Sequence, residues 1–258
     1  MNKPAANGRP AALITGGAIR LGRAITLALA AAGYDIALHY NSSAGPAAET
    51  AATVRDLGGR CTLFGHDLQD AAGIPELMGQ VTAVFPHLNL LVNNASAYDQ
   101  ATIAATTPEL FDRQLAVNLR APFFLTQAFA AAIETGTVIN ILDNKIAFNQ
   151  YEYAAYLLSK KSLADLTRLA AMEFAPRIRV NGVAPGVVLP AASRSESYLQ
   201  WRVQGIPLQR QGETRHITET ILHLLNNEFL TGQFITVDGG ESLTNIGQSA
   251  AQFDREMV

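Results

Sequence analysis

Short apolar runs alternate along the chain with longer stretches in which apolar residues recur at helical spacing. The short runs predict β-strands at residues 11–15, 35–40, 61–65, 88–93, 138–142, 178–183 and 234–237. The longer stretches predict helices at residues 21–32, 47–57, 74–85, 108–133, 153–174 and 213–226. Because the residue before a proline disfavours helix, we expect a bend or a second helix start near Pro122. Residues 186–212 show no single period.

Strands that alternate with helices in this way predict an α/β fold. We expect a single Rossmann-type sheet, doubly wound and parallel, with helices on both faces. The early strands are continuous apolar runs, which is typical of strands buried on both faces. One domain is expected to span residues 1–258, with 1–10 and about 244–258 as tails.

Composition narrows the class of protein. The 258 residues are 48% hydrophobic and 16% charged, which is typical of a globular chain. A net charge of −3 argues against nucleic acid or an anionic membrane as the main partner. The lone cysteine, Cys61, and histidines without ligand spacing predict no metal site. Without an apolar run of membrane-spanning length or a signal peptide, we expect a cytoplasmic protein.

The turn after the first predicted strand is suited to binding phosphate. It reads TGGAIRLG at residues 15–22 and opens the first predicted helix. Glycine lets the backbone approach a ligand, and a helix N-terminus favours an anion. Arg20 could contact a phosphate with two hydrogen bonds. The alternative is a tight strand–helix turn without a ligand.

The end of the second predicted strand favours NADPH over NADH. It reads HYNSS at residues 39–43 and holds no acidic residue for the ribose hydroxyls of NAD. Its hydroxyl and amide groups, with Arg20, could hold a 2′-phosphate, although a plain polar loop is the alternative. After the third strand, Asp67 could accept a hydrogen bond from the adenine amino group, or could cap a turn.

Further motifs complete a resemblance to a known family. With TGGAIRLG, the stretches LVNNAS (91–96), YLLSK (156–160), NGVAPG (181–186) and VDGG (237–240) resemble the short-chain dehydrogenase/reductase family. The resemblance covers Ala11 to Leu243. It implies an NADPH-dependent homotetramer with an interface at the helices predicted over 108–133 and 153–174. It implies a cofactor site made of Gly16, Arg20, Leu21, Tyr40, Asn41, Ser42, Asp67, Leu68, Asn94, Ala95, Ser96, Tyr156, Lys160, Pro185, Gly186 and Val188.

Within that family, the details resemble pteridine and dihydromonapterin reductases. Arg20 replaces a glycine of the usual TGxxxGxG motif, and Ser96 replaces the glycine of NNAG. Asp143, thirteen residues before Tyr156, stands where most members have a catalytic serine. One feature departs from the resemblance, because the arginine that some pteridine reductases carry near Ser42 is absent.

Asp143, Tyr156, Lys160 and Asn118 are the predicted catalytic residues. Tyr156 and Lys160 share one helix face, and the ammonium group is expected to lower the pKa of the tyrosine. An ionised Asp143 cannot donate a hydrogen bond to a carbonyl oxygen, so we expect a C=N substrate. Hydride would go to carbon, and Asp143 with Tyr156 would bring a proton to nitrogen. A turn-capping aspartate is the alternative. The resemblance implies that Asn118 holds a water or a helix kink.

The predicted substrate is a pterin bound by Ser96, Tyr98, Asp143 and Tyr156. The resemblance implies that the Tyr98 ring stacks on the flat pterin, and that residues 187–212, with Tyr198 and Trp201, close over it. Two other functions stay open: a carbonyl reductase, for example of a 3-oxoacyl thioester, and a dinucleotide-binding sensor without turnover.

Overall fold

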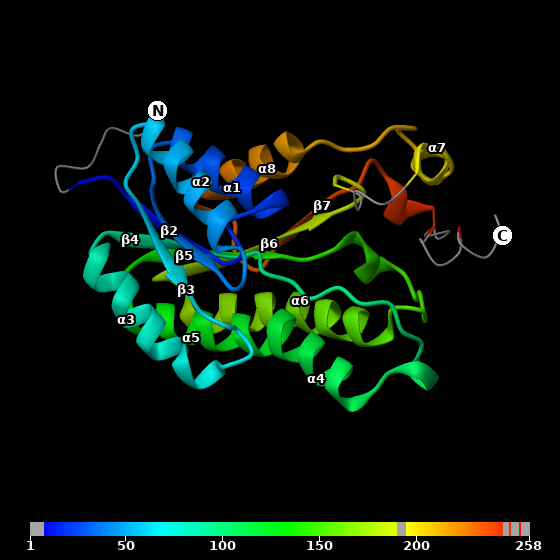
Figure 1. The fold of residues 1–258 in the computed structure, drawn as a ribbon, viewed down its shortest axis with the longest axis horizontal. Helices are drawn as coiled ribbons and strands as arrows, with labels where there is room; N and C mark the ends of the chain where they lie inside the picture. Colours follow the sequence, from blue (N-terminus) through cyan, green and yellow to red (C-terminus); the bar gives the residue numbers. More distant parts are fainter. Residues whose placement is uncertain (1–7, 190–194, 245–247, 249–252, 254–258) are drawn as a thin grey trace.

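The computed structural model describes residues 8–189, 195–244, 248 and 253. They contain a seven-stranded sheet in the order β3-β2-β1-β4-β5-β6-β7 (Figure 1). Every pairing in the sheet is parallel, so the predicted Rossmann-type α/β fold is confirmed. The strands are β1 (Ala11–Ile14), β2 (Asp35–Tyr40), β3 (Cys61–Gly65), β4 (Leu88–Asn93), β5 (Gly136–Ile141), β6 (Ile178–Pro185) and β7 (Phe234–Val237).

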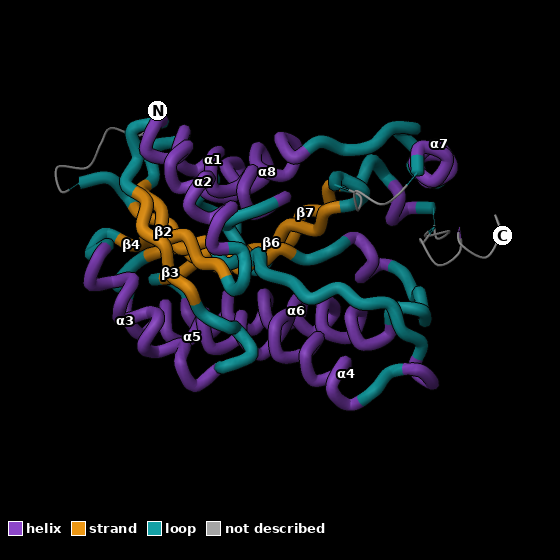
Figure 2. The backbone as a smooth tube through the Cα atoms, in the orientation of Figure 1, coloured by secondary structure: helices purple, strands orange, loops and turns teal. Residues whose placement is uncertain are grey.

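Helices cover both faces of the sheet, which lies between two helical layers in Figure 2. One layer holds α1 (Arg20–Ala31), α2 (Ala44–Asp56) and α8 (Thr214–Asn226). The other holds α3 (Ile74–Val84), α5 (Ala121–Ala132) and α6 (Ala154–Phe174). Successive residues of a strand face opposite layers, so Leu13 joins the core under α3 and α5 while Ile14 joins the core under α1. Both side chains are fully buried.

The helix predicted over 108–133 is interrupted. It consists of α4 (Pro108–Leu115), a π-helical turn at Ala116–Arg120, and α5, which has Pro122 in its first turn. A helix start next to Pro122 is therefore confirmed, because proline is tolerated where its missing N–H would have no partner.

Residues 187–212 contain a helix, α7 (Glu196–Gln204), which the pattern of apolar residues did not predict. Its amino end is capped by Ser195, whose Oγ accepts a hydrogen bond from the Tyr198 amide at 3.1 Å. In Figure 1, α7 lies apart from the two helical layers, beyond the carboxyl ends of the strands.

Part of each predicted tail lies within the described residues. Arg9 donates hydrogen bonds to the carbonyl oxygens of Gly33 and Gly58, at 3.1 and 2.7 Å, so the chain is fixed before β1 begins. After β7, a 3-10 turn at Glu241–Leu243 buries Glu241. Residues 1–7 and most of 245–258 lie outside the described residues. No helix in the described ranges is long and apolar enough to cross a membrane.

Candidate active site

A cleft of about 980 Å³ opens at the carboxyl ends of the strands. This is where ligands bind in open parallel sheets, because the loops after the strands gather there. Every residue predicted for the cofactor lines this cleft, as do Tyr98 and Asp143. Asn118 is fully buried and is not among the lining residues.

The turn between β1 and α1 is held tightly against the end of β4. The Thr15 hydroxyl accepts hydrogen bonds from the amides of Asn94 and Ala95, at 2.9 and 3.0 Å. Gly16 has a φ of +61°, which favours glycine. A Cβ on Gly22 would lie 2.0 Å from the Gly16 carbonyl oxygen, so only glycine fits there. No side chain caps the start of α1, and its amide groups remain available to an anion.

Arg20 begins α1 with an unusual φ of 51°. Its guanidinium donates a hydrogen bond to the Leu189 carbonyl, in the segment after β6. Arg20 therefore reaches across the mouth of the cleft, where its predicted contact with phosphate stays a prediction.

His39, at the end of β2, fixes the glycine turn from below. Its Nδ1 accepts a hydrogen bond from the Gly16 amide at 3.2 Å, and its Nε2 lies 3.0 Å from the His66 carbonyl oxygen. The first contact requires an unprotonated Nδ1, so Nε2 carries the proton and donates it to the His66 carbonyl oxygen in a hydrogen bond. Burial lowers the pKa of His39 to about 4, which keeps it neutral. The sequence had given no reason to single out this histidine.

Asp143 and Tyr156 are directly hydrogen-bonded. The Tyr156 hydroxyl donates to Asp143 Oδ2 at 2.6 Å, while Oδ1 accepts the Lys145 amide at 2.8 Å and caps the turn Asn144–Ala147. The aspartate thus combines the capping role with contact to the tyrosine. Burial, and then the charge of Asp143, raise the pKa of Tyr156 well above its usual value. The predicted lowering of that pKa is therefore wrong in this structure.

Lys160 lies one helical turn after Tyr156 on α6. Its Nζ donates to the Ile141 carbonyl oxygen at 2.8 Å and lies 5.9 Å from the centre of the Tyr156 ring. Burial lowers the pKa of Lys160 to about 8, and the nearby Asp143 charge only partly opposes this. Burial and the Asp143 carboxylate, rather than the Lys160 ammonium, set the direction in which the pKa of Tyr156 shifts.

Asn118 lies in the π-helical turn and clamps the segment after β4. Its Oδ1 accepts from the Ala97 amide and its Nδ2 donates to the Ala97 carbonyl, both at 2.8 Å. Nδ2 also lies 3.0 Å from Ser159 Oγ, which itself donates to the Tyr156 carbonyl at 2.6 Å. Ser159 therefore links Asn118 to the helix that carries Tyr156.

Three tyrosines form the wall at the substrate end. The Tyr98 ring stacks on Tyr153, with centres 5.1 Å apart, and meets Tyr156 edge-on at 4.7 Å. Lys145 Nζ donates to the Tyr98 hydroxyl at 3.0 Å and lies 4.1 Å from the Tyr153 ring centre. Burial lowers the pKa of Lys145. Tyr98 is half exposed, so one side of this wall remains available.

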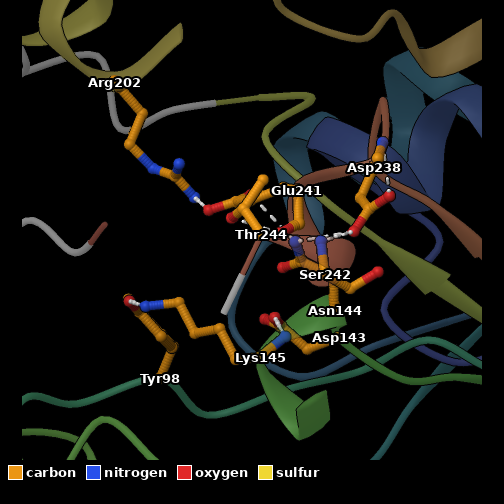
Figure 3. A network of polar contacts seen from close by, with 10 residues as sticks. Tyr98, Asp143, Asn144, Lys145, Arg202, Asp238, Glu241, Ser242 and Thr244 are labelled. Carbon is orange, nitrogen blue, oxygen red and sulfur yellow. Dashed lines mark hydrogen bonds and ion pairs between the residues drawn. The ribbon is translucent and has the colours of Figure 1, made fainter. Parts of the chain in front are cut away.

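A buried polar network lies beside this wall (Figure 3). Asn144 Nδ2 donates to Glu241 at 2.8 Å and lies 3.3 Å from an Asp238 carboxylate oxygen. Arg202 reaches Glu241 from α7, with Nη2 and Oε1 2.5 Å apart. Tyr198 of α7 also lines the cleft.

Comparison with known proteins identifies the family. A family model described as enoyl-(acyl carrier protein) reductase matches residues 17–242, which include most of the glycine turn and the Tyr156–Lys160 pair. This chain is a short-chain dehydrogenase/reductase.

Three relatives show how this short-chain dehydrogenase/reductase stands within its family. Pteridine reductase 1 of Leishmania tarentolae is 31% identical, over 91% of this chain and 97% of the relative. The FolM alternative dihydrofolate reductase 1 of Brucella canis, solved in complex with NADP, is 34% identical. Its TM-score is 0.87, over 93% of this chain and 96% of that one. A 3-oxoacyl-[acyl-carrier-protein] reductase of Staphylococcus epidermidis is 29% identical, over 89% and 97%.

The motifs of the family did not reveal the buried network of this short-chain dehydrogenase/reductase. Asn144 and Lys145 directly follow Asp143, and this position was the one signal in the sequence that could have placed them near the site. Arg202 and Glu241 carried no signal, because their partners lie far away in the sequence. Within the described ranges, no cluster of three His, Cys, Asp or Glu side chains could hold a metal.

Proposed function

We propose that this short-chain dehydrogenase/reductase is an NADPH-dependent pteridine reductase. It reduces the C=N bond of a dihydropterin, or of a dihydrofolate-like ring, to the tetrahydro form. The observation that carries the proposal is the 2.6 Å hydrogen bond between Tyr156 and Asp143. The similarity to pteridine reductase 1 and to the FolM structure supports it.

The cleft has the features that an NADPH site needs. The open start of α1 and the close approach at Gly22 leave room for a pyrophosphate on backbone amides. No acid follows β2, where Asn41 and Ser42 line the cleft. Arg20, at the start of α1, lines the same cleft, and the three residues would hold the 2′-phosphate. Lys160 would hold the nicotinamide ribose. When bound, NADPH supplies the hydride.

The carboxylate favours an imine over a carbonyl. The reduction of a carbonyl places negative charge on oxygen, and an adjacent ionised Asp143 would repel that charge. The reduction of C=N instead requires a proton at nitrogen, and a carboxylate can accept hydrogen bonds from ring N–H groups. Asp143 therefore orients the substrate through a charged acceptor, which a neutral serine hydroxyl does not provide.

The proton at nitrogen comes from the Asp143–Tyr156 pair. The raised pKa of Tyr156 keeps its hydroxyl protonated at neutral pH, so the pair holds a proton at the substrate end. Delivery of this proton to nitrogen, as hydride reaches carbon, balances the reaction, and solvent restores the proton through the partly exposed Asp143. The half-exposed ring of Tyr98, which meets Tyr156 edge-on beside this pair, would stack on the pterin ring.

The oligomeric state belongs to the same proposal. Large apolar side chains are exposed on the helices α4, α5 and α6, as expected if they meet other subunits. They include Phe111, Phe123, Leu158, Leu169 and Met172. We propose a homotetramer with these helices at its interface, and a monomer in light scattering would contradict this.

The test follows NADPH absorbance with dihydrobiopterin and, in parallel, with an acetoacetyl thioester. We expect turnover of the pterin only. Tyr156→Phe should lower kcat about a thousandfold, because the proton-bearing hydroxyl is lost. Asp143→Ser should also lower pterin turnover sharply, since serine cannot replace the carboxylate. Asp165→Asn, in an exposed ion pair with Arg168 on α6, is the control and should leave kcat unchanged.

The opposite pattern would overturn the proposal. Turnover of the thioester without turnover of the pterin would identify a carbonyl reductase. NADPH binding without turnover of either substrate would favour a sensor.

A further inference from the structure

Glu241 lies where three distant segments meet. It follows β7, is only 1% exposed, and uses its two carboxylate oxygens for two different partners. Oε1 pairs with Arg202 of α7, and Oε2 accepts the Asn144 amide from the loop after β5. Figure 3 shows these side chains converging from separate parts of the chain.

Stability alone does not explain this network. The removal of two charges from water costs free energy that their attraction often only repays, so a buried ion pair is often no better than apolar packing. Arg202 Nη1 is buried and makes no hydrogen bond in the described part of the structure. The contacts of Arg202 with Glu241 therefore do not satisfy the whole guanidinium group. What such a pair does provide is a fixed relative position of the elements that it joins.

Asn144 connects Glu241 to the site because of its neighbours. On one side, Asp143 accepts the Tyr156 hydroxyl at 2.6 Å. On the other side, Lys145 donates to the Tyr98 hydroxyl at 3.0 Å. A shift of the Asn144 peptide would move both groups, since the three residues are consecutive. The side-chain contacts of Asn144 therefore help to set the position of the carboxylate.

We propose that Glu241 is a positioning residue that couples the docking of α7 to the orientation of Asp143. The coupling runs from Arg202 through Glu241 and Asn144 to the aspartate. When α7 covers the substrate end of the cleft, Arg202 reaches Glu241, and the loop after β5 is then held in its reactive arrangement. The proposal rests on the proposed function only for the choice of substrate.

Backbone exchange tests the coupling without any turnover. Hydrogen exchange would be measured on the whole protein for Arg202→Met, which leaves the loop after β5 chemically intact. We expect faster exchange both in α7 and at residues 143–147, because the loop loses its support through Glu241. Faster exchange in α7 alone would overturn the proposal. A failure of the pterin assay would not affect this result.

Kinetics provide the second test, with whichever substrate the unaltered enzyme reduces. Glu241→Gln keeps the shape but removes the charge, and we expect kcat to fall about tenfold with the Kd of NADPH unchanged. Asp35→Asn is the matched control: it removes a buried carboxylate, paired with Arg9, at the opposite end of the sheet. It should lower the melting temperature without changing kcat. An unchanged kcat in Glu241→Gln would contradict the proposal.

A double-mutant cycle separates coupling from independent effects. If Arg202 acts on kcat through Asn144, then Arg202→Met should lower kcat less in an Asn144→Ser background than in the unaltered enzyme. Fully additive losses would show that the two residues act separately, and would overturn the coupling. Melting curves of each variant confirm that the protein is folded.

Discussion

The two ends of the cleft are built in different ways. At the nucleotide end, backbone amides make the pyrophosphate site: Gly22 allows two backbone segments to approach closely, and the Thr15 hydroxyl ties the glycine turn to the end of β4. At the substrate end, side chains make the site, and they come from positions as far apart as Asn144 and Glu241. A backbone site requires a few residues in a short stretch, whereas a side-chain site requires the completed fold.

This difference has a physical consequence for mutation. The glycine turn should fail when a side chain is added at Gly22, because two backbone segments approach each other closely there. At the substrate end, a single substitution should have a smaller effect on activity, because each side-chain contact there is one of several.

Among the changes that test this comparison of the two ends, the largest expected effect is at Gly22. Gly22→Ala places a Cβ 2.0 Å from the Gly16 carbonyl oxygen, so the turn must move. We expect the Kd of NADPH to rise at least about a hundredfold, since misplaced amides lose the pyrophosphate. Fluorescence titration measures this. Gly79→Ala in α3 is the control, because its Cβ would meet nothing within 4 Å. Equal affinity in the two variants would show that the turn is not a backbone site.

A smaller effect is expected from His39, whose Nδ1 accepts a hydrogen bond from the Gly16 amide of the glycine turn. Its pKa is about 4 in the folded protein and about 6.5 when unfolded, so the unfolded chain binds more protons between these values. Stability therefore falls as pH drops below 6.5, and His39 accounts for about 2 kcal/mol of that loss at pH 5.

Urea unfolding between pH 5 and 7 measures this contribution. His39→Gln should be less stable at pH 7 but should lose less stability on acidification. His87→Gln, at an exposed histidine near the opposite end of the sheet, is the control. An identical pH slope in the unaltered protein and in His39→Gln would show that this histidine does not remain neutral.

The smallest expected effect is at Lys145. Lys145→Met removes the hydrogen bond to Tyr98 and the charge over the Tyr153 ring, so the aromatic wall loses one support. We expect KM for the dihydropterin to rise about tenfold while NADPH binding is unchanged. Tyr98→Phe keeps the ring and should show a smaller rise. Lys161→Met, which removes a contact to Asn149 instead, is the control. A fall in NADPH affinity would mean that the two ends are not separate.

The same contrast explains how far the sequence predicts the structure. The strands and the nucleotide turn were predictable because apolar period and glycine spacing are local signals. Asp143, Tyr156 and Lys160 could be placed in one site because motifs mark them. The direction of the Tyr156 pKa was not predictable, because it depends on burial and on the contact with Asp143. Helix α7 was missed because its apolar residues follow no helical period, and Glu241 because its charge suggested exposure.

The π-helical turn at Ala116–Arg120 has a consequence for insertions and deletions. A π turn closes its hydrogen bonds over one more residue than an α turn, so it accommodates a single extra position within a helix. Deletion of one residue there would restore a continuous α-helix from α4 into α5 and rotate everything on one side of the deletion by about 100°. Asn118 would then turn away from Ala97, whereas α5 could keep its apolar face on the sheet. The extra residue of the π turn therefore sets the rotation of α4 relative to α5. With it, Asn118 faces Ala97 while the apolar face of α5 packs on the sheet.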